Sequence, residues 1–310
     1  MSPSRGNEEV QGGKGLLGRL RSAGLAPRKS LGQHFLHDPH ILGSLAESAG
    51  VGLDSNVLEI GTGPGSLTRE LASRSSSVLT VEIDERMRVF AAAELEDFDN
   101  VEILQLDALD GKRKLHPLLL ERLASLGEFI WVSNLPYKIA TTVIIALMES
   151  AVSWQRAVLT VQYEVAERIC SSAMVQGEGK RKHSNSQSSI GYGPASLLVG
   201  YWANCRFLKK IAPGSFWPPP KVDSAVLLLE PRYKVVTEEI SRDYVSFSEW
   251  VQFFFQKRRK QIGGTLRSVL GQDAANKVLR SRDLDASLRP ENLTLEDFQV
   301  LSSLFPFNNG

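Results

Sequence analysis

Four consecutive residues, Asn134-Leu135-Pro136-Tyr137, combine an amide, a free backbone carbonyl and an aromatic ring. The side-chain oxygen of Asn134 and the backbone carbonyl of Leu135 can each accept a hydrogen bond from an exocyclic NH₂ group. Pro136 lacks an N–H and has a fixed φ, so it holds the preceding carbonyl in a non-helical turn. Tyr137 offers a ring on which a nucleobase can stack. The motif therefore predicts a site for a planar amine, although an ordinary turn with Tyr137 in the core also fits it.

The elements that must position this motif begin with a glycine loop. The chain reads strand, loop and capped helix from Asn56 to Leu71. The loop glycines are Gly61, Gly63 and Gly65. Ser66 stands where the third glycine of a dinucleotide fingerprint would be, so an NAD site fits imperfectly. Glu59, ahead of the loop, opposes a pyrophosphate but suits a ligand with an ammonium and a sulfonium, a character that S-adenosylmethionine has.

Acidic residues end the next two predicted strands. Glu82 ends the strand predicted at Val78–Ile83, close to the spacing of about 20 residues from the loop at which a carboxylate binds ribose hydroxyls. Asp107 follows the strand predicted at Val101–Leu106, and its carboxylate can accept from an adenine amino group. Ligands bind beyond the carboxyl ends of parallel strands, so these two acids and Asn134 are predicted to share one edge of a sheet.

Composition limits the class of protein. The 310 residues carry 36 Lys and Arg against 35 Asp and Glu, so an RNA partner would depend on local basic patches. The two cysteines, Cys170 and Cys205, form no CxxC pair, which predicts neither a disulfide framework nor a zinc site and favours a reduced, cytoplasmic setting. No apolar run approaches the roughly 18 residues that span a membrane. We therefore expect a soluble protein without metal.

The order of the predicted elements indicates an α/β protein. Strands alternate with helices, which predicts a mostly parallel sheet. Runs at Cys205–Ile211 and Ala225–Leu229 predict an antiparallel hairpin on its edge. From Tyr233 onward, Leu and Phe recur at helical spacing. The expected parts are a disordered tail at 1–28, a catalytic domain at 29–232 and a small helical domain at 233–310.

Further motifs accompany these residues in order along the chain. They lie at Ser30–Leu36, Glu59–Gly65, Val81–Asp84, Asp107–Leu109, Ser133–Tyr137, Gln162–Arg168, Tyr192–Gly193, Phe216–Ser224 and Phe255–Lys260. With them, the chain resembles the bacterial small-subunit rRNA adenine N6-dimethyltransferases, a family shared with eukaryotic dimethyladenosine transferases and macrolide-resistance rRNA methylases. The resemblance runs from about Lys29 to Leu301. It implies a Rossmann-like S-adenosylmethionine-dependent methyltransferase sheet with an antiparallel edge hairpin and a C-terminal all-helical domain.

The resemblance also implies a substrate and roles for single residues. The expected reaction is N6-dimethylation of adjacent adenosines in a hairpin near the 3′ end of small-subunit rRNA, by a monomer acting on immature small subunits. Catalysis would rest on Asn134 to Tyr137. The implied S-adenosylmethionine contacts are His34, Leu36, Gly61, Gly63, Glu82, Asp107 and Asn134. This chain has His34 where the family often has Asn, and Tyr163 where Lys is common.

Basic clusters predict the RNA contacts. The predicted residues are Lys221, Arg258, Arg259 and Lys260, and further clusters lie at Lys209-Lys210 and Lys180–Lys182. The last cluster falls in Ser171–Tyr192, a stretch without hydrophobic period that predicts a mobile loop. A run of charges is also typical of a solvated face.

Three other interpretations stay open. An NAD-dependent oxidoreductase is one, but the Asn134–Tyr137 motif has no role in hydride transfer. A large-subunit rRNA adenine N6-methylase of the macrolide-resistance type is the second, and the Phe216–Ser224 motif looks more like the small-subunit enzymes. The third is a non-catalytic RNA-binding or transcription-factor relative, against which the intact Asn134, Pro136 and Tyr137 argue.

Overall fold

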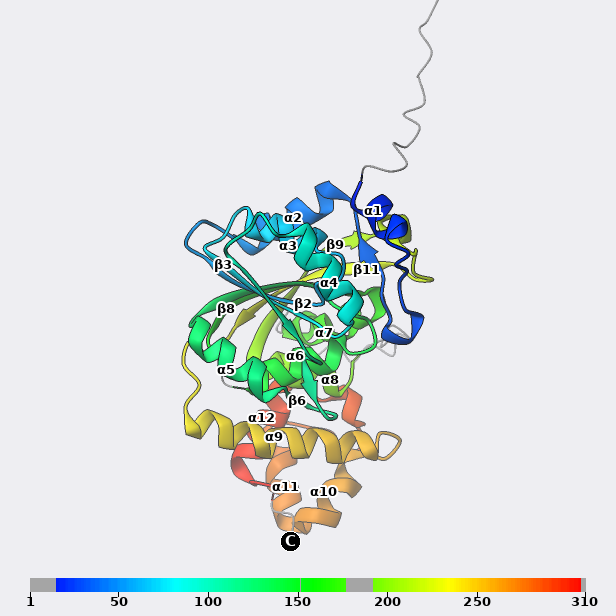
Figure 1. Cartoon of the computed structure of the whole chain (residues 1–310). Helices are drawn as coiled ribbons and strands as arrows, with labels where there is room; N and C mark the ends of the chain where they lie inside the picture. The colour runs from blue at the N-terminus through cyan, green and yellow to red at the C-terminus, as the bar shows by residue number, and fades with distance from the viewer. Residues whose placement is uncertain (1–14, 151, 177–191, 308–310) are drawn as a thin grey trace, which may run out of the picture.

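The centre of the molecule is a seven-stranded sheet with the order β4-β3-β2-β7-β8-β11-β9 (Figure 1). The computed structural model describes residues 15–150, 152–176 and 192–307. The strands are β2 (Asn56–Ile60), β3 (Ser77–Glu82), β4 (Val101–Gln105), β7 (Phe129–Asn134), β8 (Trp154–Gln162), β9 (Ala203–Ile211) and β11 (Ser224–Pro231). The strands from β4 to β8 run parallel, whereas β11 is antiparallel to both β8 and β9. The predicted parallel sheet with an antiparallel edge hairpin is therefore confirmed.

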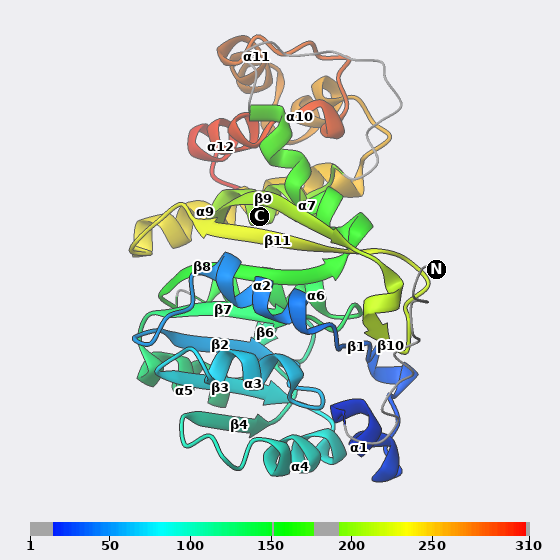
Figure 2. The same cartoon turned by 90° about the horizontal axis from the view of Figure 1, so that it is seen from above.

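Helices cover both faces of this sheet (Figure 2). They are α2 (Pro39–Ala49), α3 (Ser66–Ala72), α4 (Glu85–Glu94), α5 (Pro117–Leu126), α6 (Ala140–Glu149), α7 (Tyr163–Gln176) and α8 (Pro194–Trp202). Successive side chains of a strand point to opposite faces, so Val57 packs toward α2 and α3 while Leu58 belongs to the cluster that includes α5 to α8. Burial on both faces explains the continuously apolar strands.

The N-terminal segment crosses the carboxyl edge of the sheet. Helix α1 (Leu16–Ser22) buries Leu20 fully in a small cluster with Phe35 and with Met87 of α4. Next, β1 (Phe35–Leu36) pairs antiparallel with β10 (Phe216–Trp217). The prediction of a disordered tail at 1–28 missed α1, because seven residues carry too weak a helical period; residues 1–14 lie outside the described part.

Short elements complete the fold. Near the sheet they are β5 (Leu109–Asp110), β6 (Lys114–Leu115) and the 3₁₀ turns at Lys29–Leu31 and Pro213–Ser215, and a further 3₁₀ turn at Pro290–Asn292 precedes the last helix. Cys170 of α7 and Cys205 of β9 are joined by a disulfide, with their Cα atoms 5.3 Å apart. Nothing in the spacing of the two cysteines indicated this pairing, and the expectation of a reduced pair is wrong here. The bond joins two elements that already pack together.

The chain after residue 233 forms helices that pack beneath α8 in Figure 1. They are α9 (Glu238–Gln256), α10 (Ile262–Leu270), α11 (Gln272–Ser281) and α12 (Leu295–Leu304). Tyr201 of α8 contacts Phe247 of α9, with ring centroids 4.8 Å apart, and Phe254 is fully buried. The predicted all-helical C-terminal part is confirmed. Its hydrophobic core is continuous with the core beneath the sheet.

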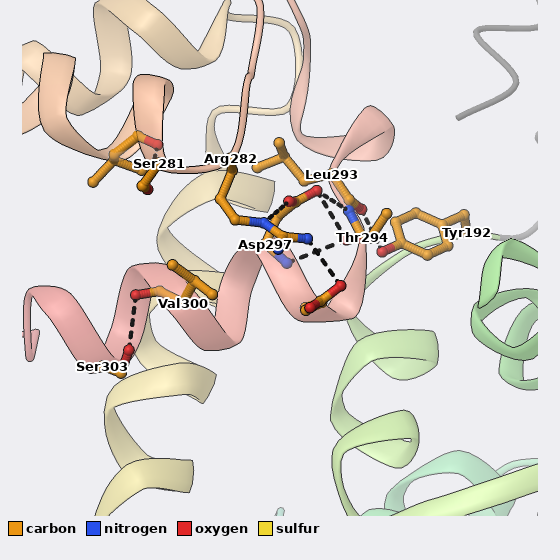
Figure 3. Close-up of polar contacts among 10 residues, drawn as sticks. Tyr192, Ser281, Arg282, Leu293, Thr294, Asp297, Val300 and Ser303 are labelled. Carbon is orange, nitrogen blue, oxygen red and sulfur yellow. Dashed lines mark hydrogen bonds and ion pairs between the residues drawn. The ribbon is translucent and has the colours of Figure 1, made fainter. Parts of the chain in front are cut away.

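A buried carboxylate, Asp297, organises the start of α12 and joins it to the end of α11 (Figure 3). Asp297 accepts from Arg282 Nε at 2.8 Å and from both the backbone N–H and the hydroxyl of Thr294 at 2.9 Å. Immediately before this cap, the Leu293 carbonyl accepts from the Tyr192 hydroxyl at 2.5 Å. Burial, and then the charge of Asp297, raise the pKa of Tyr192, so the hydroxyl stays protonated and able to donate. The start of α12 is thus tied to the segment that leads into α8.

Gly263 and Gly264 of α10 test how closely this helix packs against Ala286. A Cβ on Gly263 would stand 2.5 Å from the Cβ and 2.9 Å from the carbonyl oxygen of Ala286, whereas one on Gly264 would meet nothing within 4 Å. Gly263→Ala is expected to destabilise the protein by about 1–3 kcal/mol through overpacking. Gly264→Ala, the matched control, should stabilise it by up to about 1 kcal/mol through helix propensity. Denaturant unfolding of both variants measures this, and equal effects would refute the close approach.

Candidate active site

The carboxyl ends of β2, β3 and β7 open into one cavity, which the segment Ser30–Phe35 closes from the N-terminal side. Its walls bring together nine of the residues that the sequence predicted for catalysis or cofactor contact. These are His34, Gly61, Gly63, Glu82, Asp107, Asn134, Leu135, Pro136 and Tyr137. Ligand sites are expected beyond the carboxyl ends of strands, and the structure agrees with that expectation.

The loop needs glycines for two reasons: its backbone has positive φ angles, and neighbouring side chains lie too close to leave room for a Cβ. Gly61 and Gly63 have φ of +96° and +54°, which disfavour other residues. A Cβ on Gly63 would lie 3.0 Å from the Phe35 ring, and one on Gly61 would lie 3.3 Å from Cδ of Pro136. The two glycines therefore let the loop, the N-terminal segment and the Asn134–Tyr137 motif meet around one space.

Glu82 is held rigidly at the cavity. One carboxylate oxygen accepts from the Gly63 N–H at 2.8 Å, and the other accepts from the Asp84 N–H at 2.8 Å. Burial raises the pKa of Glu82, although these backbone donors oppose the shift. Asp84 caps α4; burial acts against ionisation there too, but hydrogen bonds and charges from Arg86 and then Arg28 lower its pKa overall. The last residue of β3 therefore carries one carboxylate toward the cavity, and the turn that follows carries another toward the N-terminal segment.

The amide of Asn134 has a defined orientation. Its Nδ2 donates to the backbone carbonyl of His34 at 2.9 Å. A carbonyl can only accept, so nitrogen must face His34 and oxygen must face away. This oxygen, Oδ1, is buried, and no donor among the described residues reaches it. The orphaned acceptor at a cavity wall suits a ligand that brings an N–H.

The rings of Tyr137 and His34 are each held by a hydrogen bond to a residue that the sequence did not predict as part of the site. The Tyr137 hydroxyl hydrogen-bonds with Oγ of Ser224, and its ring stacks with the His34 ring at 5.4 Å between centroids. Nδ1 of His34 lies 2.7 Å from the Pro218 carbonyl and must therefore donate to it. Ser224 and Pro218 belong to a motif identified by resemblance, but no spacing along the chain indicates these contacts.

Five predicted site residues lie elsewhere. The side chain of Leu36 is buried in the cluster with α2 and α3 and forms no part of this wall. Lys221 is exposed before β11, and Arg258, Arg259 and Lys260 are exposed in the turn after α9. Arg258 Nε lies 3.7 Å from a carboxylate oxygen of Glu291. The loop cluster Lys180–Lys182 falls outside the described residues.

Glu59 does not face a ligand, contrary to the hypothesis that its charge suits an ammonium. It is 1% exposed, and its Oε2 accepts from the hydroxyls of Thr68 at 2.6 Å and Thr80 at 2.8 Å. Burial raises the pKa of Glu59 to about 8, against the effect of these hydrogen bonds. The strand alternation sends this side chain beneath the loop toward α3, where it supports the loop from below.

The described residues contain no group of three or more His, Cys, Asp or Glu side chains placed to hold a metal ion. Within the same ranges, no helix is both long and apolar enough to cross a membrane.

The sheet order and the cavity at the ends of β2, β3 and β7 define a Rossmann-like α/β protein with a site suited to a nucleoside-bearing ligand. The family model described as ribosomal RNA adenine dimethylase matches residues 24–305. The chain belongs to the ribosomal RNA adenine dimethylase family.

Curated and solved relatives agree with this placement. The chain is 34% identical to ribosomal RNA small subunit methyltransferase A of Ligilactobacillus salivarius over 288 residues, which cover 91% of each protein. It is 33% identical to the protein of the same name from Alkaliphilus oremlandii, over 89% of this chain and 90% of the relative. A solved dimethyladenosine transferase from Plasmodium falciparum superposes with a TM-score of 0.65 and 25% identity, covering 87% of this chain and 97% of that one. The 23S rRNA methyltransferase ErmE shares the fold, with a TM-score of 0.63, 23% identity and coverage of 87% and 98%.

Glu59 is expected to make stability depend on pH. Its pKa in the folded protein, about 8, exceeds the ordinary value of 4.5, so the folded state keeps a proton that the unfolded state releases between these values. The stabilisation is complete below the lower value and is lost as pH rises toward the higher one, at up to about 1.4 kcal/mol per pH unit.

Glu59→Gln isolates this effect, because both threonine bonds go to one oxygen and the amide oxygen can accept both. The difference in unfolding free energy between wild type and Glu59→Gln should change steadily across this pH window. Glu121→Gln, at an exposed position of α5, is the control and should show no such change. A constant difference for Glu59→Gln would contradict a protonated carboxyl.

Proposed function

We propose that the protein transfers methyl groups from S-adenosylmethionine to N6 of adenosines in small-subunit rRNA, giving N6-dimethyladenosine. Membership of the ribosomal RNA adenine dimethylase family supports the reaction type. The observation that carries the assignment of the site is the buried, unpartnered Oδ1 of Asn134 beside the Tyr137 ring. An acceptor and a stacking face at one cavity fit the amino group and the ring of an unstacked adenine.

The cofactor fits the chemistry of the other cavity residues. Glu82 offers carboxylate oxygens that can accept from ribose hydroxyls, and Asp107 offers one for an adenine amino group. Gly61 and Gly63 line the same cavity, and neither has a side chain that would keep a ligand away from the backbone. S-adenosylmethionine, when bound, supplies an electrophilic methyl group next to the Asn134 motif.

The motif would position and polarise the target amine. Asn134 Oδ1 and the Leu135 carbonyl accept its two N–H bonds, which draws the nitrogen lone pair out of conjugation with the ring. Tyr137 fixes the plane of the base, and Ser224 fixes Tyr137. The catalytic effect is positioning and electrostatic preorganisation, without a covalent nucleophile. Each transfer would form an N6–CH₃ bond, break the sulfonium S–CH₃ bond to leave S-adenosylhomocysteine, and release one amine proton to water. After the first transfer the nitrogen keeps one hydrogen, which can donate to one of the same acceptors for a second transfer.

The proposed substrate follows from the relatives and from local charge. The curated relatives above are named as small-subunit rRNA methyltransferases. We infer that a monomer recognises the immature small subunit in the cytoplasm, with phosphate contacts from Lys221, Arg258, Arg259 and Lys260. All four side chains are exposed, as phosphate contacts require.

Asn134→Ala tests the catalytic assignment. Removing the acceptor should lower the rate of methyl transfer to immature small subunits by about 10²–10³-fold, the range for loss of one preorganised polar group. S-adenosylmethionine affinity, measured by calorimetry, should fall much less. Asn204→Ala, at an exposed position of β9, should transfer at the wild-type rate. Wild-type turnover by Asn134→Ala would remove this residue from the mechanism.

Replacing Arg258, Arg259 and Lys260 together by Ala tests the RNA contacts. Each lost phosphate contact reduces the slope of log affinity against log salt by about 0.7–0.9. The triple variant should therefore bind the subunit more weakly, and its affinity should depend less steeply on salt. Its S-adenosylmethionine affinity and thermal midpoint serve as controls. An unchanged salt slope would assign the cluster to a solvated surface.

A further inference from the structure

A cluster of two aromatic rings and a cation lies beside the proposed base site, outside the cavity. Tyr163, the first residue of α7, meets Phe207 of β9 edge to face at 5.8 Å between centroids. The ammonium of Lys210 lies over the Tyr163 ring at 5.0 Å. Phe207 is 40% exposed, although its neighbours on β9 include buried Cys205 and Ile211. An exposed ring supported by a second ring and a cation is a surface on which a nucleobase can stack.

Two consecutive residues connect this cluster to the base platform. Ser224 holds the Tyr137 hydroxyl, while the Asp223 carbonyl accepts from the Tyr163 N–H at 3.0 Å. The Asp223 carboxylate also pairs with the Lys210 ammonium at 2.6 Å. Successive Cα atoms are about 3.8 Å apart, so the two ring systems are fixed to neighbouring points of the chain.

A bulge on the edge strand creates the cluster. Side chains three apart on a regular strand point to opposite faces, yet both Phe207 and Lys210 contact Tyr163. The pairing of β9 with β11 shifts by one residue here, because Val226 pairs with Lys209 whereas Leu227 pairs with Phe207. The extra residue turns Phe207 to the face of Lys210. Bulges of this kind frequently re-aim side chains next to active sites.

The charges around the cluster favour a base over a phosphate as its ligand. Asp223 neutralises Lys210, and Glu167 adds a further negative charge near this ammonium. Lys209, on the other face of the strand, donates to the Ser44 hydroxyl. Phe207 remains 40% exposed at the cluster, and the attraction of an aromatic ring for a base is independent of net charge.

We propose that Tyr163, Phe207 and Lys210 form a second stacking site, which binds the base of the nucleotide next to the target adenosine. The inference rests on the proposed RNA-methylating function and adds the recognition of a neighbouring base to it. RNA recognition commonly works on splayed, unpaired bases stacked on aromatic and cationic side chains. Holding the neighbour would keep the strand open while the target adenine occupies the cavity.

The test measures affinity for a synthetic RNA hairpin with two adjacent adenosines in its loop, in the presence of S-adenosylhomocysteine. The hairpin is compared with versions in which the base on the 5′ or the 3′ side of the target adenosine is removed to leave an abasic site. Wild-type protein should bind at least one abasic version about 5–10-fold more weakly, the loss expected for one stacked base. Phe207→Ser should bind the complete hairpin with a similar loss and should no longer distinguish it from that abasic version.

Two further variants make the result specific. Phe207→Tyr keeps a ring and should retain the discrimination, whereas Leu53→Ser replaces another exposed apolar residue, 79% exposed, and should behave as wild type. If Phe207→Ser and removal of the base each weaken binding of the hairpin independently, so that their effects add, the second stacking site is overturned. It is also overturned if wild-type protein binds both abasic hairpins as tightly as the complete one. Transfer of methyl groups to immature subunits by wild-type protein is measured in parallel. Its absence would refute the proposed function instead.

Discussion

The arrangement of the site depends on the single orientation available to the Asn134 amide. The His34 carbonyl accepts from Nδ2, which leaves Oδ1 as the atom offered to a ligand. This bond exists only because the N-terminal segment crosses the sheet edge at that point. The segment is held there by the pairing of β1 with β10, and by the hydrogen bond from His34 to Pro218. Residues from three distant parts of the chain thus set the direction of one side-chain oxygen.

Two buried acidic residues near the loop differ in their place: Glu59 lies beneath the loop, and Glu82 lines the cavity. Glu59 and Glu82 end or nearly end adjacent strands, and burial raises the pKa of both. Glu59 is enclosed by threonine hydroxyls beneath the loop, so it fixes the loop as a neutral acid near pH 7. Glu82 keeps backbone donors on both oxygens while still forming cavity wall. Position relative to the strand end therefore decides which carboxyl supports the loop and which one lines the cavity.

Sequence patterns predicted the sheet better than they predicted the contacts across it. The strands predicted at Val78–Ile83 and Val101–Leu106 match β3 and β4 nearly to the residue, because buried parallel strands are short apolar runs bounded by turns. The same logic placed Glu82, Asp107 and Asn134 at one cavity. It failed for Glu59, because a motif does not show on which side of a strand its acid is buried. It missed α1 and the disulfide, which depend on tertiary packing rather than on any local period.

The antiparallel direction of β11 places the start of this strand at the carboxyl edge of the sheet, next to the cavity. Because β11 runs against β8, its first residue, Ser224, stands opposite Gln162 at the carboxyl edge. Because β11 begins at this edge, the loop that precedes it also lies there, and that loop contains Pro218 and Asp223. The brace for His34 and the brace for Tyr137 are therefore parts of one short segment, so moving this segment would disturb both rings together. These two hydrogen bonds fix one wall of the cavity from a single edge of the sheet.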